Sequence, residues 1–164
     1  MTTPTPSPSL DLLTTLSTDA NYSAQSYFEA AKSADFWSRI IVFLPALVAA
    51  LAGMITALYS IKIGGPISAV SGAVAATAAF IGSGKQASSY RESARKYTNL
   101  RHAARLEIAV SQSKTEPELE KVARDLFERR EAIVSSDEPV PNRFFDRASK
   151  RIDAGVTSYS RDDE

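Results

Sequence analysis

The chain contains no cysteine and a single histidine among its 164 residues. The absence of cysteine excludes disulfides, thiolate metal sites and cysteine nucleophiles, and it fits a chain whose polar part faces a reducing cytosol. His102 has no second imidazole or thiolate nearby in the sequence to complete a metal site. No nucleophile and base, and no pair of acids, converge in the sequence. We therefore expect a protein that is not an enzyme and that holds no cofactor or metal.

Charge is also missing from two long stretches. Residues 40–59 and 63–82 carry none of the 19 basic and 19 acidic residues of the chain. As helices, each stretch would be about 30 Å long, which is the thickness of the hydrocarbon core of a bilayer. Neither shows the polar stripe of a helix packed on a soluble core. We predict a transmembrane helical hairpin, and the alternative is a pair of buried helices in a soluble domain.

Basic residues are distributed unevenly around these two stretches. The connection holds only Lys62, whereas several basic residues follow the second stretch. Because basic flanks stay on the cytoplasmic side, we predict a multi-pass protein of the inner (plasma) membrane with both termini in the cytoplasm. The first ten residues lack the basic residue of a secretory signal, so the first stretch would direct its own insertion. The predicted basic anchor is Lys85, Arg91, Arg95, Lys96 and Arg101.

Small residues recur at four-residue spacing in both apolar stretches, a pattern that lets helix backbones approach closely in lipid. They pack either within the hairpin alone or also between protomers of a homo-oligomer. Two helices cannot enclose an aqueous path, so a pore would need several copies. No ionisable residue lies inside either stretch, which argues against a proton relay or an ion-coupled transporter. The predicted helix-packing residues are Ala49, Gly53 and Ala57 in the first stretch and Gly64, Ser68, Gly72 and Ala76 in the second.

The flanking segments read as a tail, a leading helix and a second tail. Residues 1–17 are rich in Pro, Ser and Thr, which predicts a disordered tail. A helix then leads into the first span, with Asp19 as its N-cap and an apolar side of Tyr22, Phe28, Ala31 and Trp37. Residues 18–152 form the predicted domain, and residues 153–164 a polar tail.

After the hairpin the chain becomes amphipathic, and we predict two cytoplasmic helices at about 85–112 and 116–135. Thr115 and Glu118 have the spacing of a capping box, which marks the start of the second helix. The second helix is expected to fold back on the first. The predicted contacts are Tyr97 and Ile108 with Leu119 and Leu126. The predicted fold class is therefore all-α, a two-span hairpin with a flanking amino-terminal helix and a cytoplasmic helical hairpin.

This order of parts resembles the SLATT family (SMODS and SLOG-associating two-transmembrane effectors). The resemblance covers roughly residues 18–152 and includes a long basic helix with Tyr90-Arg91, Ala94-Arg95-Lys96-Tyr97 and Leu100-Arg101. It implies an effector of prokaryotic defence or conflict systems that oligomerises to form a pore or perturb the membrane, and it transfers no catalytic residues. These 164 residues contain no sensor domain, so the trigger would come from a separately encoded sensor or nucleotidyltransferase system, or from a diffusing ligand. The alternative is a non-catalytic membrane anchor or scaffold that recruits a cytoplasmic partner. The bilayer is the expected partner, and nucleic acid is not.

Overall fold

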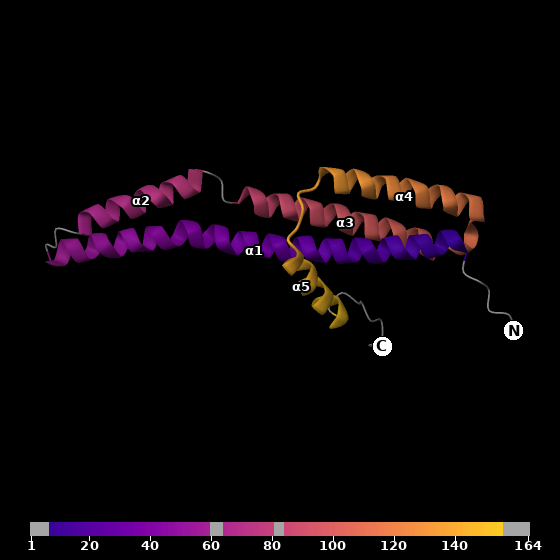
Figure 1. Ribbon diagram of the computed structural model, residues 1–164, viewed down its shortest axis with the longest axis horizontal. Helices are drawn as coiled ribbons and strands as arrows, with labels where there is room; N and C mark the ends of the chain where they lie inside the picture. Colours follow the sequence, from indigo (N-terminus) through magenta and orange to yellow (C-terminus); the bar gives the residue numbers. More distant parts are fainter. Residues whose placement is uncertain (1–6, 60–63, 81–83, 156–164) are drawn as a thin grey trace. The chain divides into compact units, whose positions relative to one another are not determined.

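The computed structural model describes residues 7–59, 64–80 and 84–155, and the regular structure of these residues is helical. The α-helices are α1 (Pro8–Tyr59), α2 (Gly64–Phe80), α3 (Lys85–Ala109), α4 (Glu116–Ser136) and α5 (Asn142–Asp153), with a short 3₁₀ turn, η1 (Ser111–Ser113), between α3 and α4. The predicted all-α class is confirmed. The helices form two compact units (Figure 1). We call residues 31–88 the apolar unit, and residues up to 30 together with those from 89 onward the bundle unit.

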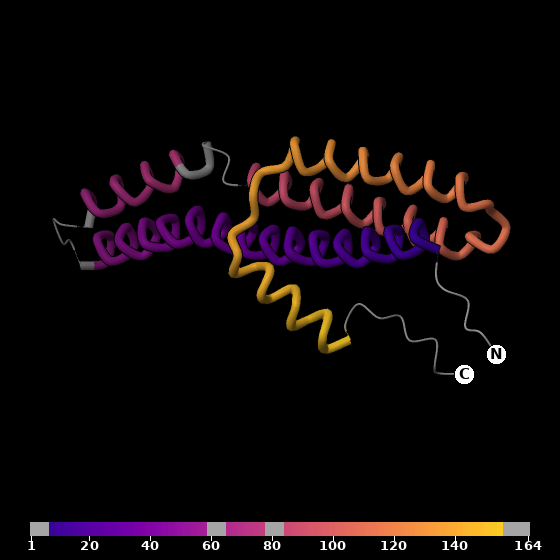
Figure 2. Tube along the Cα trace, turned by 45° about the vertical axis from the view of Figure 1, so that its right-hand side comes forward, coloured from indigo at the N-terminus to yellow at the C-terminus, as the bar shows by residue number. Residues whose placement is uncertain are grey.

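The bundle unit is built on three helices that run side by side, namely residues 8–30 of α1, α3 and α4 (Figures 1 and 2). The chain direction alternates from α1 to α3 and again from α3 to α4, and α5 packs on the other side of α1. Many core positions are alanine, which allows the helices to pack closely. The core consists of Leu13, Leu16, Ala20, Ala24, Tyr27 and Ala30 of α1, Tyr90, Ala94, Tyr97, Leu100 and Ala104 of α3, Leu119, Ala123 and Leu126 of α4, and Val140, Phe144 and Ala148 of the α5 segment.

The first helix begins much earlier than its sequence predicts. Ser7 starts α1, because its carbonyl oxygen accepts hydrogen bonds from the N–H groups of Leu10 at 3.0 Å and Asp11 at 3.1 Å. Its hydroxyl oxygen also accepts from Leu10 N–H at 3.3 Å. Pro8 suits the first helical position, where no N–H is needed. The prediction of a disordered tail is therefore wrong for residues 8–17, whereas residues 1–6 lie outside the described residues. Asp19 lies inside α1 and is not its N-cap.

The buried face of α1 differs from the predicted one for the same reason. Leu13 and Leu16 are fully buried and set the face, and Ala20, Ala24 and Tyr27 continue it at spacings of three and four. Of the residues predicted to form the apolar side, Ala31 is buried, Tyr22 and Phe28 are partly exposed, and Trp37 is exposed. The predicted tail includes Leu13 and Leu16, so the predicted helix lacked the two residues that define its buried face.

The fold-back of α4 on α3 agrees with the sequence prediction. α3 ends at Ala109, three residues before the predicted end, and η1 completes the turn. The predicted capping box is confirmed at the start of α4. The carboxylate of Glu118 accepts hydrogen bonds from the N–H of Thr115 at 2.8 Å and from its hydroxyl at 2.7 Å. These bonds hold the pKa of Glu118 below its usual range.

The apolar unit contains the rest of α1 and the whole of α2. The leading helix continues into the first apolar stretch without a break, as predicted, so that α1 has 52 residues. Within the described ranges, α1 is the one helix that is long and apolar enough to cross a membrane. α2 has 17 residues and no charged side chain. The predicted second stretch, residues 63–82, is one residue longer than α2 at its start and two residues longer at its end. Those residues, 63, 81 and 82, lie outside the described residues.

Candidate functional site: an apolar helix segment and a polar helical bundle

The apolar part of α1 has no buried residue among those that the structure describes. In the 18-residue window that qualifies as a membrane span, no residue is buried. Phe43 is 65% exposed and Leu58 is 69% exposed, and these two lie near opposite ends of the segment. A soluble monomer rarely exposes so large a continuous apolar surface, and such surfaces mark contacts with membranes or other proteins. The other exposed large residues are Ile41, Leu44, Leu47, Val48, Leu51, Met54 and Ile55.

Aromatic and charged residues mark the entrance to this segment. Phe36 and Trp37 are 60% and 57% exposed, and their rings meet edge to face with centroids 6.1 Å apart. Beside them, Arg39 forms an ion pair with Asp35 at 3.0 Å. Amphipathic rings and snorkelling cations favour the headgroup layer of a membrane. The local arrangement is therefore that of a helix passing from water into lipid.

The structure brings together some of the predicted helix-packing residues. An ideal Cβ on Gly53 would lie 3.8 Å from Ser68 Oγ, so α1 and α2 approach each other at this point. Ala49 and Gly72 are also partly covered, whereas Ala57 and Ala76 are exposed. A Cβ on Gly72 would meet no heavy atom within 4 Å among the described residues. Gly64 begins α2, and its burial is outside what the structure describes.

Two threonine hydroxyls in the apolar unit are hydrogen-bonded to their own helices. Thr56 donates to the carbonyl of Ala52 at 2.8 Å, and Thr77 donates to the carbonyl of Ala73 at 2.8 Å. Such back-bonding leaves no unpaired hydroxyl hydrogen to attract water. These two residues therefore do not oppose burial of the helices in lipid.

A cluster of tyrosines lies at one end of the bundle unit. The ring of Tyr27 stacks on that of Tyr97 with centroids 5.4 Å apart and meets that of Tyr90 at 6.0 Å. The hydroxyl of Tyr27 donates to the carbonyl of Glu138 at 3.0 Å, which ties the segment before α5 to α1. Burial is the main cause that raises the pKa of Tyr27 and of Tyr97 above the usual range.

Two of the predicted basic anchors instead have partners within the bundle. Arg101 is partly buried and donates from Nη1 to Asn21 Oδ1 at 2.7 Å, linking α3 to α1. Burial, and next the neighbouring Arg105, lower its pKa. Lys96 Nζ lies 3.7 Å from Asp137 Oδ1, whose side chain is only 3% exposed. The other three predicted anchors, Lys85, Arg91 and Arg95, are exposed.

The predicted cytoplasmic packing residues are only partly the core. Tyr97, Leu119 and Leu126 are buried, and Ile108 is partly exposed. The sequence prediction did not include Tyr27, whose ring stacks on that of Tyr97, or Asn21, whose side chain accepts a hydrogen bond from Arg101. Their signal was present as the spacing of Leu13, Leu16 and the following alanines.

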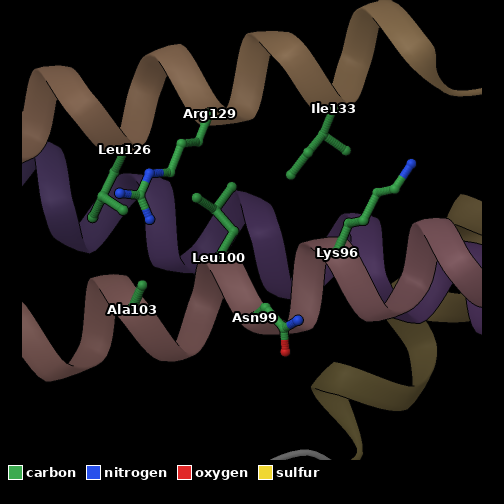
Figure 3. Close-up of a pocket in the computed structure, with 7 residues that line it drawn as sticks. All are labelled: Lys96, Asn99, Leu100, Ala103, Leu126, Arg129 and Ile133. Atoms are coloured by element: carbon green, nitrogen blue, oxygen red, sulfur yellow. The ribbon is translucent and has the colours of Figure 1, made fainter.

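An open groove lies between α3 and α4 (Figure 3). Its volume is about 270 Å³. Leu100 and Ile133 point into the space between the two helices, whereas Asn99 points away from α4. Both cations at the groove already have acidic neighbours, since Arg129 pairs with Asp125 at 2.8 Å and Lys96 with Asp137. The groove is lined by Lys96, Asn99, Leu100, Ala103, Leu126, Arg129 and Ile133.

No group of three or more His, Cys, Asp or Glu residues within the described ranges is placed to hold a metal ion. His102 is exposed, and its Nε2 lies 3.5 Å from Nη2 of Arg101. Comparison with protein-family models, with curated proteins and with solved structures finds no match to the chain. The functional argument therefore depends on the residues of this chain.

Proposed function

We propose that the protein is an integral membrane effector similar to SLATT proteins. In this proposal, α1 and α2 enter the bilayer as a hairpin, both termini and the bundle unit lie in the cytoplasm, and several copies assemble to form a pore or perturb the membrane. A separately encoded sensor or nucleotidyltransferase system would supply the trigger. The bundle unit would receive it.

The observation that carries the proposal is the unburied apolar segment of α1. Nine large apolar side chains between residues 41 and 58 are each at least 40% exposed. In water, exposed apolar surface costs about 25 cal/mol per Å², and the described residues leave these nine side chains exposed. Lipid would cover it at no such cost. The exposed aromatic pair at its entrance, Phe36 and Trp37, supports the same assignment.

The assignment of α2 as a second span is supported by composition and by contact with α1. Its 17 residues would extend about 25 Å at 1.5 Å per residue. A span slightly shorter than the hydrocarbon core is accommodated by thinning of the bilayer or by oligomerisation. The close approach of Gly53 and Ser68 is the small-residue contact expected of a hairpin in lipid.

Assembly of several copies is supported by small residues of α1 and α2 that the described part of the chain leaves open. Gly72 presents open backbone, with no described atom within 4 Å of an ideal Cβ. Ala57 and Ala76 are exposed in the single chain. Small residues at these positions would let a second copy approach closely, and a ring of copies is what an aqueous path requires.

Membrane potential tests the effector activity. A potential-sensitive dye should report depolarisation in cells that express the protein with its genomic neighbours when the trigger is given. A chain with Leu51→Arg, which places a charge in the middle of the apolar segment, is the inactive control. Reporters at the two ends should both lie in the cytoplasm, and a tag beside Lys62 should be reached from outside. An inserted, well-expressed protein that never depolarises the membrane would contradict the effector proposal.

A second candidate, a membrane anchor or scaffold, is favoured by the open groove between α3 and α4. Ile133 is partly exposed at this groove, where it lies beside the buried side chains of Leu100 and Leu126. A scaffold would recruit a cytoplasmic partner without changing membrane potential. The dye experiment therefore separates the two candidates, because an inserted chain without any depolarisation is the result expected of a scaffold.

A further inference from the structure

α5 has a sharply divided surface. At 100° per residue, its apolar side chains fall within an arc of about 100°. These are Phe144, Phe145, Ala148 and Ile152. Its basic side chains, Arg143, Arg147, Lys150 and Arg151, occupy the neighbouring arc of about 100°. With Asp146 and Asp153 included, the net charge of the helix is +2. A short basic amphipathic helix of this kind is typical of segments that bind membrane surfaces.

The bundle covers only one side of the apolar arc. Phe144 is 4% exposed and Ala148 is fully buried, so these two residues dock the helix. Phe145, one position further along, is 41% exposed, and Ile152 is only partly covered. Docking to the bundle therefore leaves a large aromatic side chain in water. A flat apolar surface would accommodate all four residues at once.

The cations of α5 are available for an external partner. Arg143, Arg147 and Lys150 are exposed, and no ion pair joins them to a carboxylate in the described part of the chain. Arg143 and Arg147 lie over the ring of Phe144, at 4.8 Å and 5.6 Å from its centroid. The cations therefore flank the apolar arc on one side, where the headgroups of a bilayer would lie if the arc rested on the acyl chains.

Few polar contacts hold α5 in its docked position. The carbonyl of Glu138 accepts the hydroxyl of Tyr27, and Arg151 pairs with Glu29 of α1. The connecting residues 137–141 are not helical, so α5 can turn about them without unwinding α4. The face of α5 opposite Phe144 and Ala148 carries Asp146 and Asp153, which would repel an anionic surface. Contact with lipid through the apolar arc therefore requires α5 to leave the bundle.

We propose that α5 is a lipid-binding helix, which leaves the bundle and lays its apolar arc on the surface of an anionic membrane. We assign lipid as the partner for two reasons. The bundle buries only part of the apolar arc, and the adjoining arc is cationic. The proposal rests on the proposed function in one respect, since a chain anchored by α1 keeps α5 at high effective concentration near lipid. Release would uncover Tyr27 and the site that Phe144 occupies.

A single tryptophan on α5 tests this directly. The chain has one tryptophan, so Phe145→Trp combined with Trp37→Phe leaves position 145 as the only reporter. The full chain is placed in nanodiscs of phosphatidylcholine, with or without phosphatidylglycerol. In the anionic discs, the emission should shift to the blue and be quenched by brominated lipid. In the zwitterionic discs, both effects should be several-fold weaker.

Matched variants test charge and release separately. Lys150→Glu should lower the lipid-bound to docked ratio roughly tenfold or more, because each cation near an anionic surface contributes about a fivefold change. Lys121→Glu makes the same change at an exposed position of α4 and should have no effect. The chain has no cysteine of its own, so Glu29→Cys and Arg151→Cys can be bridged by a short bifunctional thiol reagent. The bridge should abolish quenching.

The outcomes are distinct. Emission that is unchanged by lipid would overturn the proposal and assign the exposed arc to a protein partner. Quenching that survives the bridge would overturn release. Equal effects of Lys150→Glu and Lys121→Glu would overturn the role of the α5 cations. Failure of the chain to enter discs would contradict the proposed function alone. In that case, vesicles of the same two compositions would be added to the soluble chain, and the emission at position 145 would still show whether α5 binds lipid.

Discussion

Two adjacent leucines offer a sharp test of the bundle. Leu13 is fully buried, whereas Leu12 is 48% exposed on the same turn of α1. Replacing a buried leucine by alanine costs about 2–5 kcal/mol, because apolar contacts are lost and a cavity remains. Leu12→Ala removes a side chain that is only half covered, and we expect its cost to be below about 1.5 kcal/mol. If residues 8–17 were a disordered tail, both substitutions would be neutral.

The assay is thermal unfolding in mild detergent, followed by near-ultraviolet circular dichroism. The stacked rings of Tyr27 and Tyr97 supply a signal from the bundle unit. For a domain of about 100 residues, each 1 kcal/mol moves the melting temperature by roughly 4–8 °C. Leu13→Ala should therefore lower it by at least about 8 °C, and Leu12→Ala by a clearly smaller amount measured under the same conditions. Equal shifts for the two variants, or none for Leu13→Ala, would refute the packing of α1 residues 8–30 with α3 and α4.

Three further predictions concern the hairpin, the tyrosines and the polar contact between α1 and α3. Gly53→Leu should separate α1 from α2, which would be measured as a longer distance between spin labels at positions 58 and 67. Gly72→Leu should leave this distance unchanged and weaken only crosslinking between copies. The reverse pattern would contradict the placement of these glycines. Because burial raises the pKa of Tyr27, the neutral tyrosine contributes its full stability to the folded bundle below pH 10, the ordinary tyrosine value. This contribution is lost as the pH rises above that value. Bundle unfolding on alkaline titration should therefore coincide with a late rise in tyrosinate absorbance. In a Tyr27→Phe chain this late rise should be smaller, with the part due to buried Tyr97 remaining; a late rise of unchanged size would argue against the burial of Tyr27. Asn21→Ala should cost about 1–3 kcal/mol, because it leaves the partly buried guanidinium of Arg101 without its partner, and the same melting assay would show no change if the bond did not contribute.

Much of the fold followed from local signals in the sequence. The capping box of Thr115 and Glu118 marks the start of α4, because the two side chains and the backbone groups they satisfy lie within one helical turn. The apolar stretch after Arg39 was equally clear. The end of α3 was predicted to within three residues, since Ser111–Ser113 form a 3₁₀ turn and no Gly or Pro marks the end of the helix.

The start of α1 could not be predicted in the same way, because its stabilising contacts are distant in the chain. The N–H of Ser9 donates to Glu116 at 3.2 Å, across 107 residues. Hydrogen bonds from Ser9 and Ser7 hold the pKa of Glu116 below its usual range, so the first turn of α1 and the first turn of α4 satisfy each other. The Pro, Ser and Thr residues of this segment locally favour disorder, although Leu13 and Leu16 have the spacing of a buried helix face.

The predicted anchor residues also show that contacts between distant parts of the chain cannot be predicted from local sequence. Lys96 and Arg101 read as exposed cations beside a span, but Asp137 and Asn21 reach them only once the bundle has formed. Lys85, Arg91 and Arg95 are exposed, and their role as a basic anchor stays a prediction. Charge counting identifies a basic segment, but it does not distinguish cations that face outward from cations that stabilise the packing.

Cysteine accessibility in membrane vesicles tests the central claim most directly, because the natural chain has no cysteine. Leu51→Cys and Leu12→Cys sit at positions of almost equal exposure in the structure, 47% and 48%. In inverted vesicles, a water-soluble maleimide should label position 12 readily and position 51 only after the membrane is dissolved in detergent. Equal labelling of the two cysteines in intact vesicles would show that the apolar segment of α1 lies in water, and it would contradict the membrane assignment.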